Sequence, residues 1–199
     1  MLFSDVIILY SLGAPALSVT LAGPSQKHSG KAIMVDFTLT YHGVTNEEGE
    51  PTEEIQPITI DTDAFFYTNS SDRLYRRNEN AQWENSVNDE VCGGGIADED
   101  ISINIKESAS FVSLRPGDTW TTSYSLDDQL PDYEAVGDVF LYRFHGTTIE
   151  WWDWGDKETY ASPLVTLRSW ISGGGFDPPG NSMNLLVPAS NDLEFTTVE

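Results

Sequence analysis

The sequence predicts an all-β fold, an antiparallel immunoglobulin-like β-sandwich, with a closed β-barrel as the alternative. Apolar and polar residues alternate along several segments, clusters of Gly, Pro, Asn and Asp separate these segments, and helical spacing is nearly absent. The 199 residues suffice to bury one substantial core without disulfide or metal support. We therefore expect one sandwich domain over residues 17–199, preceded by an N-terminal extension over residues 1–16.

The N-terminal extension contains a short apolar stretch, residues 2–12, which is followed by the small-residue pattern Ala14, Pro15, Ala16. Such a pattern is typical of a signal-peptide cleavage site, but no Lys or Arg precedes the stretch and Asp5 interrupts it. About eleven apolar residues are also too few to cross a hydrocarbon core that needs roughly 20. We expect an edge strand or a loose extension here, with a cleaved signal as the alternative.

Three segments show the alternation of well-defined strands: residues 32–41, 118–126 and 138–145. In the first two, every second residue is mostly apolar or aromatic and the residues between are mostly Asp, Thr or Ser, which predicts half-buried strands. Both faces of the third are largely apolar, which predicts a central strand. Weaker runs bring the expected total to about nine strands. These runs are residues 17–21, 58–67, 101–106, 147–154, 163–171 and 193–198.

Three connections between these strands carry specific predictions. In residues 114–118, Pro116 presets the second position of a turn and Gly117 supplies the positive φ that a type II turn needs at the third. Residues 69–97 have no clear period and are expected to form a long irregular insertion, of the kind that is often functional. Residues 173–181 are expected to form a second flexible loop.

The charge of the chain limits its partners. Ten Lys and Arg residues stand against 32 Asp and Glu residues, so the formal net charge is -22. A phosphate backbone or an anionic lipid surface would be repelled by such a protein. The sequence therefore predicts no nucleic-acid partner and no membrane insertion.

Cysteine content bears on the compartment. Cys92 is the single cysteine, so the chain can form no internal disulfide, and this favours a cytoplasmic location. The signal-like extension and a glycosylation sequon at Asn69 keep secretion as the alternative. Cys92 precedes three glycines and is interpreted as a small buried residue rather than as an activated thiol.

One block of sequence is distinctive. It reads VGDVF at residues 136–140, YRFHG at 142–146 and WWDWGDKE at 151–158. Together with PGDTW at 116–120 and VPAS at 187–190, the block resembles a family of small uncharacterised proteins from filamentous ascomycete fungi. The resemblance covers most of the chain and implies no assigned activity.

The expected order of strands and turns also resembles the immunoglobulin-like domain of fungal deuterolysin-type zinc proteases and the bacterial intracellular proteinase inhibitors. This topological likeness makes proteinase inhibition one hypothesis for the function. No His-Glu-x-x-His motif occurs in the chain, so the resemblance does not imply protease activity.

Catalytic and metal-binding signatures are missing from the sequence. It contains no Gly-x-Ser-x-Gly elbow, no P-loop and no dinucleotide fingerprint. The three histidines have no ligand spacing, and the acidic runs at 98–100 and 127–132 are interpreted as solvated loops rather than as calcium ligands. The sequence therefore predicts a non-catalytic protein without a cofactor or a metal site.

Two groups of residues are candidates for binding. The long insertion holds Arg73, Arg76 and Arg77 beside Trp83, and these arginines either pair with nearby carboxylates or recognise an anionic group on a partner. Internal pairing, for example with Asp72 or Glu79, is the favoured interpretation. The leading functional hypothesis is a module that binds a protein or peptide through end loops, above all this insertion.

The second group of candidates lies in the tryptophan-rich segment. Trp151 would face away from Trp152 and Trp154 on a strand, so these two could form an outer aromatic pair that stacks on sugar rings. Packing of all three rings inside the protein is the competing interpretation, and the favoured one. Carbohydrate binding through Trp152 and Trp154 is accordingly the alternative function.

Overall fold

The structure, a computed structural model, describes residues 15–44, 56–67, 73–86, 99–126, 130–131, 134–161, 163–169, 175–177, 179–181 and 184–199. In chain order its elements are β1 (Pro15–Ala22), β2 (Gln26–His28), β3 (Met34–Val44), β4 (Ile58–Asp61), α1 (Ala64–Tyr67), β5 (Leu74–Arg77), β6 (Trp83–Asn85), β7 (Ile101–Asn104), β8 (Phe111–Leu114), β9 (Thr119–Ser125), β10 (Val139–Tyr142), β11 (Thr147–Ile149), β12 (Trp152–Trp154), the 3-10 helix η3 (Lys157–Thr159), β13 (Leu164–Leu167), β14 (Phe176–Asp177), β15 (Leu185–Val187) and β16 (Leu193–Val198).

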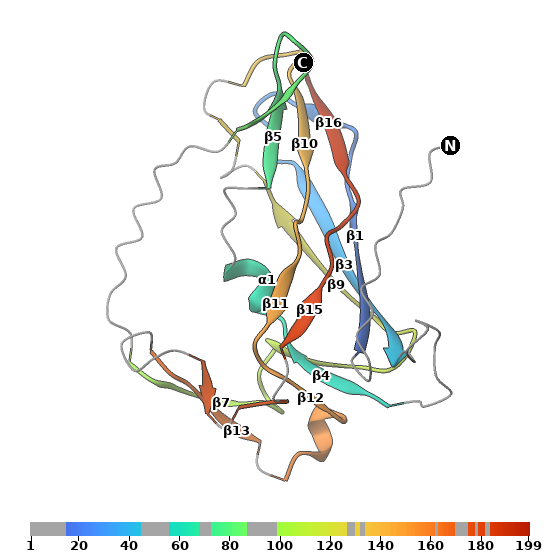
Figure 1. The fold of residues 1–199 in the computed structure, drawn as a ribbon. Helices are drawn as coiled ribbons and strands as arrows, with labels where there is room; N and C mark the ends of the chain where they lie inside the picture. The colour runs from blue at the N-terminus through green and yellow to red at the C-terminus, as the bar shows by residue number, and fades with distance from the viewer. Residues whose placement is uncertain are drawn as a thin grey trace.

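Two layers of strands form the body of the molecule. One sheet has the order β1-β3-β9, and the facing sheet has the order β2-β16-β10-β5-β6. The short pair β11 and β15 continues the direction of β10 and β16 along the molecule (Figure 1). All of these pairings are antiparallel except β2 with β16. The predicted all-β sandwich is confirmed, and none of the described sheets closes into a barrel.

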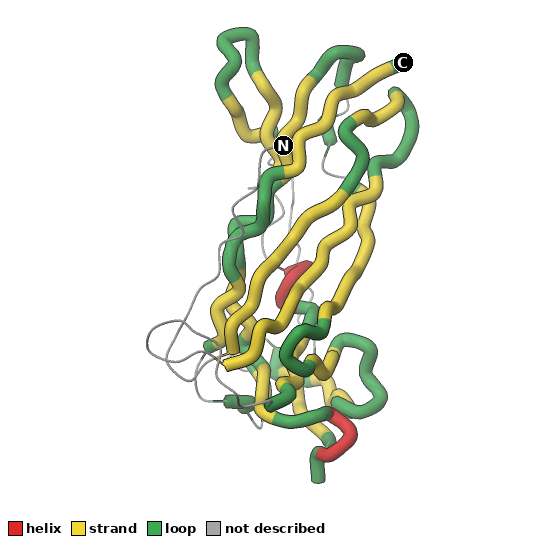
Figure 2. Tube along the Cα trace, turned by 90° about the vertical axis from the view of Figure 1, so that its right-hand side faces the viewer, coloured by secondary structure: helices red, strands yellow, loops and turns green. Residues whose placement is uncertain are grey.

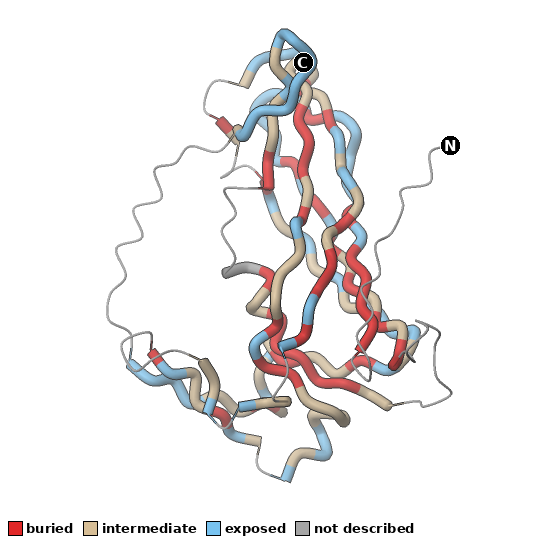
Figure 3. Tube along the Cα trace, in the orientation of Figure 1, coloured by how far each residue is buried: buried red, intermediate tan, exposed pale blue. Residues whose placement is uncertain are grey.

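The core lies between the two layers and follows from the alternation in sequence. Along β3, Val35, Phe37, Leu39 and Tyr41 are buried while the residues between them face outward. Figure 3 shows buried segments recurring along the long strands, and Figure 2 shows several of these strands extending along much of the length of the molecule. β10 is the middle strand of its sheet, as its two apolar faces predict.

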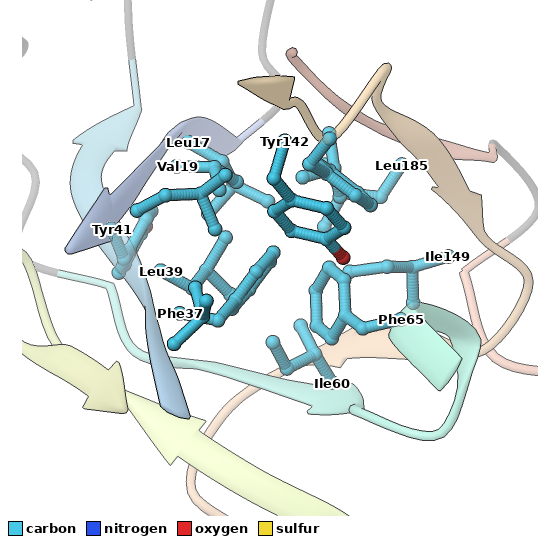
Figure 4. Packing of buried hydrophobic residues seen from close by; sticks show 14 of the residues in the cluster. Leu17, Val19, Phe37, Leu39, Tyr41, Ile60, Phe65, Tyr142, Ile149 and Leu185 are labelled. Atoms are coloured by element: carbon cyan, nitrogen blue, oxygen red, sulfur yellow. The ribbon is translucent and has the colours of Figure 1, made fainter. Parts of the chain in front are cut away.

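Aromatic rings join the two layers. Phe37 on β3 meets Phe65 of α1 at a centroid distance of 5.1 Å and Phe144, just after β10, at 5.2 Å. The hydroxyls of Tyr124 on β9 and Tyr142 on β10 share a hydrogen bond of 2.8 Å. Figure 4 shows Phe37, Phe65 and Tyr142 among the aliphatic side chains of this cluster. Each ring therefore contributes apolar burial and, through its edge, a fixed packing geometry.

A separate small sheet of three strands sits at one end of the sandwich. Its order is β14-β13-β7, and it lies in the lower part of Figure 1. A cluster separate from the main core, Ile105, Phe111, Trp151 and Val165, packs beneath it. Trp151 links this sheet to β8, because its ring centroid lies 4.9 Å from that of Phe111 on β8 and 6.5 Å from that of Phe176 on β14.

The turn predicted at residues 114–118 is present. Asp118 N–H donates to the carbonyl of Arg115 at 2.8 Å, and Gly117 has a φ of 90°. The Asp118 carboxylate also accepts a hydrogen bond from the Arg115 N–H at 2.9 Å. A type II turn therefore links β8 to β9, for the reason that the Pro-Gly pair predicts.

Three of the predicted segments differ from the structure. Residues 58–67 form β4 followed by the short helix α1, rather than one strand, and residues 147–154 form two strands, β11 and β12. The expected irregular insertion at 69–97 contains the hairpin of β5 and β6. Strands of three or four residues are too short to establish a period in the sequence, so tertiary pairing decides them.

The expected boundary between extension and domain falls inside a strand. β1 begins at Pro15, and Ala16 is already buried. Residues 1–14 lie outside the described part of the chain. Within the described residues, no helix has the length and apolar character required to span a membrane.

Gly180 makes a close backbone contact that yields a testable prediction. Asn181 N–H donates to the carbonyl of Trp152 at 2.6 Å, which brings the two backbones together. A Cβ at Gly180 would lie 2.9 Å from the backbone nitrogen of Trp152 and closer still to its carbonyl oxygen. Gly180→Ala is therefore expected to lower the free energy of unfolding by about 1–3 kcal/mol, measured by urea denaturation.

Gly23→Ala is the matched control for this substitution. A Cβ there would first meet the flexible end of Leu193, at 3.0 Å. The smaller obstacle predicts a smaller loss of stability. Equal losses in the two variants would contradict the close-contact explanation for Gly180.

Candidate functional site

A pocket of about 260 Å³ lies where the sandwich meets the small sheet. The strand β4, the start of α1 and the strand β11 form one side of it, and β7, β13 and β14 form the other. The lining residues on the sandwich side are Asp61, Asp63, Ala64, Thr147, Thr148 and Glu150. Those on the side of the small sheet are Ile103, Leu167 and Phe176. One wall is therefore acidic and polar, and the opposite wall is apolar.

Asp61 is the buried acid of this pocket. It is the last residue of β4, and its backbone N–H donates to the carbonyl of Trp151 at 3.0 Å, which holds it in place. Asp61 is only 7% exposed, and its Oδ1 accepts a hydrogen bond from the Asp63 N–H at 3.1 Å. Burial raises the pKa of Asp61 to about 6, and the carboxylates of Asp63 and Glu150 act in the same direction.

A carboxyl that titrates near neutral pH inside a cavity is typical of a functional site. The pocket is smaller than the roughly 300–1,000 Å³ of a small-molecule site, so its size suits a single side chain or a small group. An ammonium or guanidinium group placed beside Asp61 would provide the positive partner that a buried carboxylate requires. The apolar wall would at the same time contact the hydrocarbon stem of that side chain. The arrangement is therefore suited to binding a cation with an apolar stem.

No metal centre is found among the residues that the structure describes: His, Cys, Asp and Glu nowhere gather in a group of three or more that could hold an ion. The acidic run at 127–132 lies largely outside the described ranges, and Asp98 does so as well. Glu99 and Asp100 are exposed, and Asp100 accepts a hydrogen bond from the Ser169 N–H at 2.9 Å.

Arg73 is a structural residue rather than a surface one. It is buried, and both Nη1 and Nη2 donate to the carbonyl of Phe65 at 3.3 Å. Its guanidinium carbon lies 5.0 Å from the centroid of the Phe144 ring. Arg73 therefore holds α1 against the core through the Phe65 carbonyl, and little of its side chain reaches the surface.

Arg76, Arg77 and Trp83 come together on the hairpin of β5 and β6. Arg76 pairs with a carboxylate of the same chain, Asp138, at 2.6 Å. The guanidinium carbon of Arg77 lies 6.0 Å from the ring of Trp83, which is 38% exposed. The hairpin also borders a polar pocket of about 510 Å³, which Asn78 and Glu84 help to line.

The expected outer pair of Trp152 and Trp154 requires a correction. Trp152 is 1% exposed and belongs to the main core, and the half-buried Trp154 packs edge-on against it at a centroid distance of 5.1 Å. Trp151 is buried on the opposite face, in the smaller cluster. Trp151 and Trp152 are buried in the two clusters and Trp154 is half-buried against Trp152, so Trp152 and Trp154 do not form the expected outer pair.

Sequence reasoning missed the acidic pocket, although one signal pointed to it. Asp61 interrupts the apolar run of residues 58–67, where a charged residue on a buried strand requires a partner or a function. Glu150 and Phe176, which complete the pocket, are distant from Asp61 in sequence and carry no such signal. Cys92 and Trp170 lie outside the described residues.

Comparisons with known proteins add no assignment. No family model, no curated protein and no solved structure matches this chain. The resemblance to small fungal proteins and the topological likeness to proteinase inhibitors therefore stay predictions.

Proposed function

We propose that the protein is a non-catalytic module that binds a protein or peptide by taking one of its basic side chains into the acidic pocket. The observation that carries this proposal is the buried carboxyl of Asp61, which faces a cavity whose opposite wall is formed by Ile103, Leu167 and Phe176. A lysine or arginine side chain has the matching chemistry, since an apolar stem ends in a cation. Part of the pocket lining comes from the small sheet β14-β13-β7, which lies in the lower part of the molecule in Figure 1, so the pocket is near one end of the fold, where binding loops are commonly found.

The charge of the whole chain supports the same class of partner. A net charge of -22 attracts a basic segment over a distance before any contact forms. Glu150 is exposed at the pocket and Asp63 is half-buried, so both can act on an approaching cation. A cation that enters the pocket then meets the buried carboxylate of Asp61. This interaction is less screened by water than one with an exposed carboxylate, so it favours a side chain that fits the pocket.

A peptide titration tests this function. The probe is the pentapeptide Ala-Ala-Arg-Ala-Ala with blocked ends, and its control replaces arginine with the neutral, nearly isosteric citrulline. We expect NMR shift changes at the backbone amides of Asp61, Asp63 and Phe176 with the arginine peptide, and none with the citrulline peptide. Equal responses to the two peptides would overturn the proposal.

Two variants locate the binding on the protein. Asp61→Asn is expected to weaken binding of the arginine peptide by about tenfold or more, because the buried carboxylate is lost. Glu194→Gln removes the same charge from an exposed position on β16 and is expected to leave the affinity nearly unchanged. Weakening of similar size in both variants would mean that the net charge, and not the pocket, attracts the peptide.

Carbohydrate binding is the second candidate, and the structure favours Trp83 as its centre. Among the tryptophans that the structure describes, Trp83 is the one classed as exposed, and it is next in sequence to Glu84, which with Asn78 helps to line the polar pocket. An exposed ring next to amide and carboxylate groups suits a sugar, which presents an apolar face and polar edges.

A glycan array tests this candidate with Trp83→Ala and, as the control, Leu186→Ala at another exposed apolar residue. A signal that is equal in both variants would exclude Trp83.

A further inference from the structure

The sheet β1-β3-β9 has two edge strands, and the edge along β1 is covered. Leu21 N–H donates to Oδ1 of Asn191 at 2.8 Å, and Nδ2 of Asn191 donates back to the Leu21 carbonyl at 3.1 Å. The inward side chains Leu17 and Val19 on β1 are fully buried. The side-chain amide of Asn191 thus takes the place of a neighbouring strand at Leu21, and burial protects the edge at Leu17 and Val19.

The hydrogen-bond pattern defines the other edge, along β9. Leu126 N–H donates to the Ile33 carbonyl at 3.0 Å, and Tyr41 N–H donates to the Asp118 carbonyl at 3.1 Å. Bonded and non-bonded pairs alternate in an antiparallel ladder, so the even-numbered residues 120–124 bond to β3. The N–H and C=O groups of the odd-numbered residues 119–123 therefore point away from β3.

These outward groups are available. Within the described part of the chain, no hydrogen bond joins the backbone of Thr119, Thr121 or Ser123 to another segment. The side chains of Thr121 and Ser123 bond to Thr38 and Asp36 on the outer face of the sheet, which leaves the backbone edge open. An edge of this kind offers ready pairing to another strand.

The core is also less well covered along β9 than along its neighbour. The inward residues Trp120, Thr122 and Tyr124 are half-buried, whereas Phe37 and Leu39 on the adjacent β3 are almost fully buried. Aliphatic side chains from one more strand would cover the exposed parts of these aromatic rings. Apolar area removed from water in this way favours binding and offsets part of the cost of association.

The outer face of the edge favours a basic strand. β9 carries no charged residue, and it lacks the lysines and prolines with which natural edges avoid pairing. The exposed carboxylates Asp36 and Asp118 flank it, in a chain whose net charge is -22. A lysine placed opposite Ser123 on an added strand could reach toward Asp36.

We propose that β9 accepts an extended segment of a partner as an additional strand of this sheet. The segment has aliphatic side chains on the face turned toward Trp120 and Tyr124, and lysine or arginine on the opposite face. Its backbone pairs with the outward N–H and C=O groups of Thr119, Thr121 and Ser123, by strand addition. The proposal concerns a surface separate from the acidic pocket and does not depend on it.

A labelled model peptide tests the proposal directly. The probe alternates lysine and valine over seven residues, beginning and ending with lysine, and its binding is followed by fluorescence polarisation. We expect saturable binding that weakens with added salt, together with slower hydrogen exchange at the Thr121 amide. The control peptide has the same charge but carries an N-methyl group on every backbone amide, so neither of its edges can donate the hydrogen bonds of strand pairing. Equal affinity for the two peptides would overturn the proposal.

Three variants place the binding at this edge. Thr121→Pro removes an edge-facing N–H without removing a hydrogen bond to β3, and Thr121→Lys adds a like charge opposite the added strand. Both are expected to weaken peptide binding by about tenfold. Thr20→Lys makes the same charge change on the same face of β1, at the covered edge, and is expected to change the affinity less than about twofold.

The remaining outcomes are also decisive. If the protein alone forms dimers that Thr121→Pro dissociates, a second copy is the occupant and the partner proposal is wrong. Slow exchange of the Thr121 amide without peptide would show that the chain itself covers the edge, which also overturns the proposal. The slower hydrogen exchange of the Thr121 amide with peptide should persist in Asp61→Asn, because this amide reports on the β9 edge and not on the pocket, so a failure at β9 is distinguishable from a failure at the pocket.

Discussion

Trp152→Ala is expected to lower the free energy of unfolding by about 4 kcal/mol, the largest loss among the variants considered. The ring is almost fully buried in the main core, and Trp152 pairs with Ile60 on β4 while its carbonyl anchors Asn181. Truncation removes apolar burial and leaves a cavity that the surrounding strands cannot readily fill. Urea denaturation followed by circular dichroism measures the change.

Trp154→Ala is the comparison, because this neighbouring ring is only half-buried and packs against Trp152 from one side. We expect a loss of about half the size or less. The same comparison bears on carbohydrate binding, since sugar affinity lost in Trp152→Ala would reflect unfolding. Equal, small losses in both variants would show that the ring of Trp152 is more accessible than the structure places it.

Asp61→Asn is expected to stabilise the protein at neutral pH while weakening its binding of a cationic side chain. Burial raises the pKa of Asp61 from 3.8 to about 6, so the folded protein favours the protonated carboxyl. Between about pH 4 and pH 6 the folded state holds more protons than the unfolded state, and stability therefore falls as the pH rises. The full penalty, about 3 kcal/mol, is present above that range.

The stabilising effect of asparagine must follow the same pH range. It should be near zero at about pH 3.5, grow between pH 4 and 6, and level off at about 2–3 kcal/mol by pH 7.5. Glu194→Gln, at an exposed position on β16, is the control for the change in net charge. A gain that is constant with pH would mean that the pKa of Asp61 is not raised by burial. Binding of the arginine peptide should strengthen over the same rise in pH, because ionised Asp61 is the binding form.

A gain in stability together with a loss of binding is what we expect when a residue that serves the function is replaced. A buried carboxyl that costs stability is retained where its charge is used, since protein interiors otherwise exclude unpaired acids. Arg73 shows the contrasting case, because its buried guanidinium is satisfied by the Phe65 carbonyl and the ring of Phe144. Both are charged residues that the fold buries. Their roles differ because Arg73 has bonding partners around it, whereas the surroundings of Asp61 disfavour its charge.

The alternation of apolar and polar residues and the residues of the turns were enough to predict the sandwich and the inward faces of β3 and β9. They also predicted the central position of β10 and the turn at Pro116 and Gly117. Side-chain period and turn chemistry involve residues close together in the chain, so they can be read without the fold. Only the tertiary structure decided where Trp152 and Arg73 lie, that Asp61 and Phe176 share one pocket, and that Asn191 covers β1 while the β9 edge stays open within the described residues. Each of these depends on contacts between segments far apart in sequence, which no local pattern encodes.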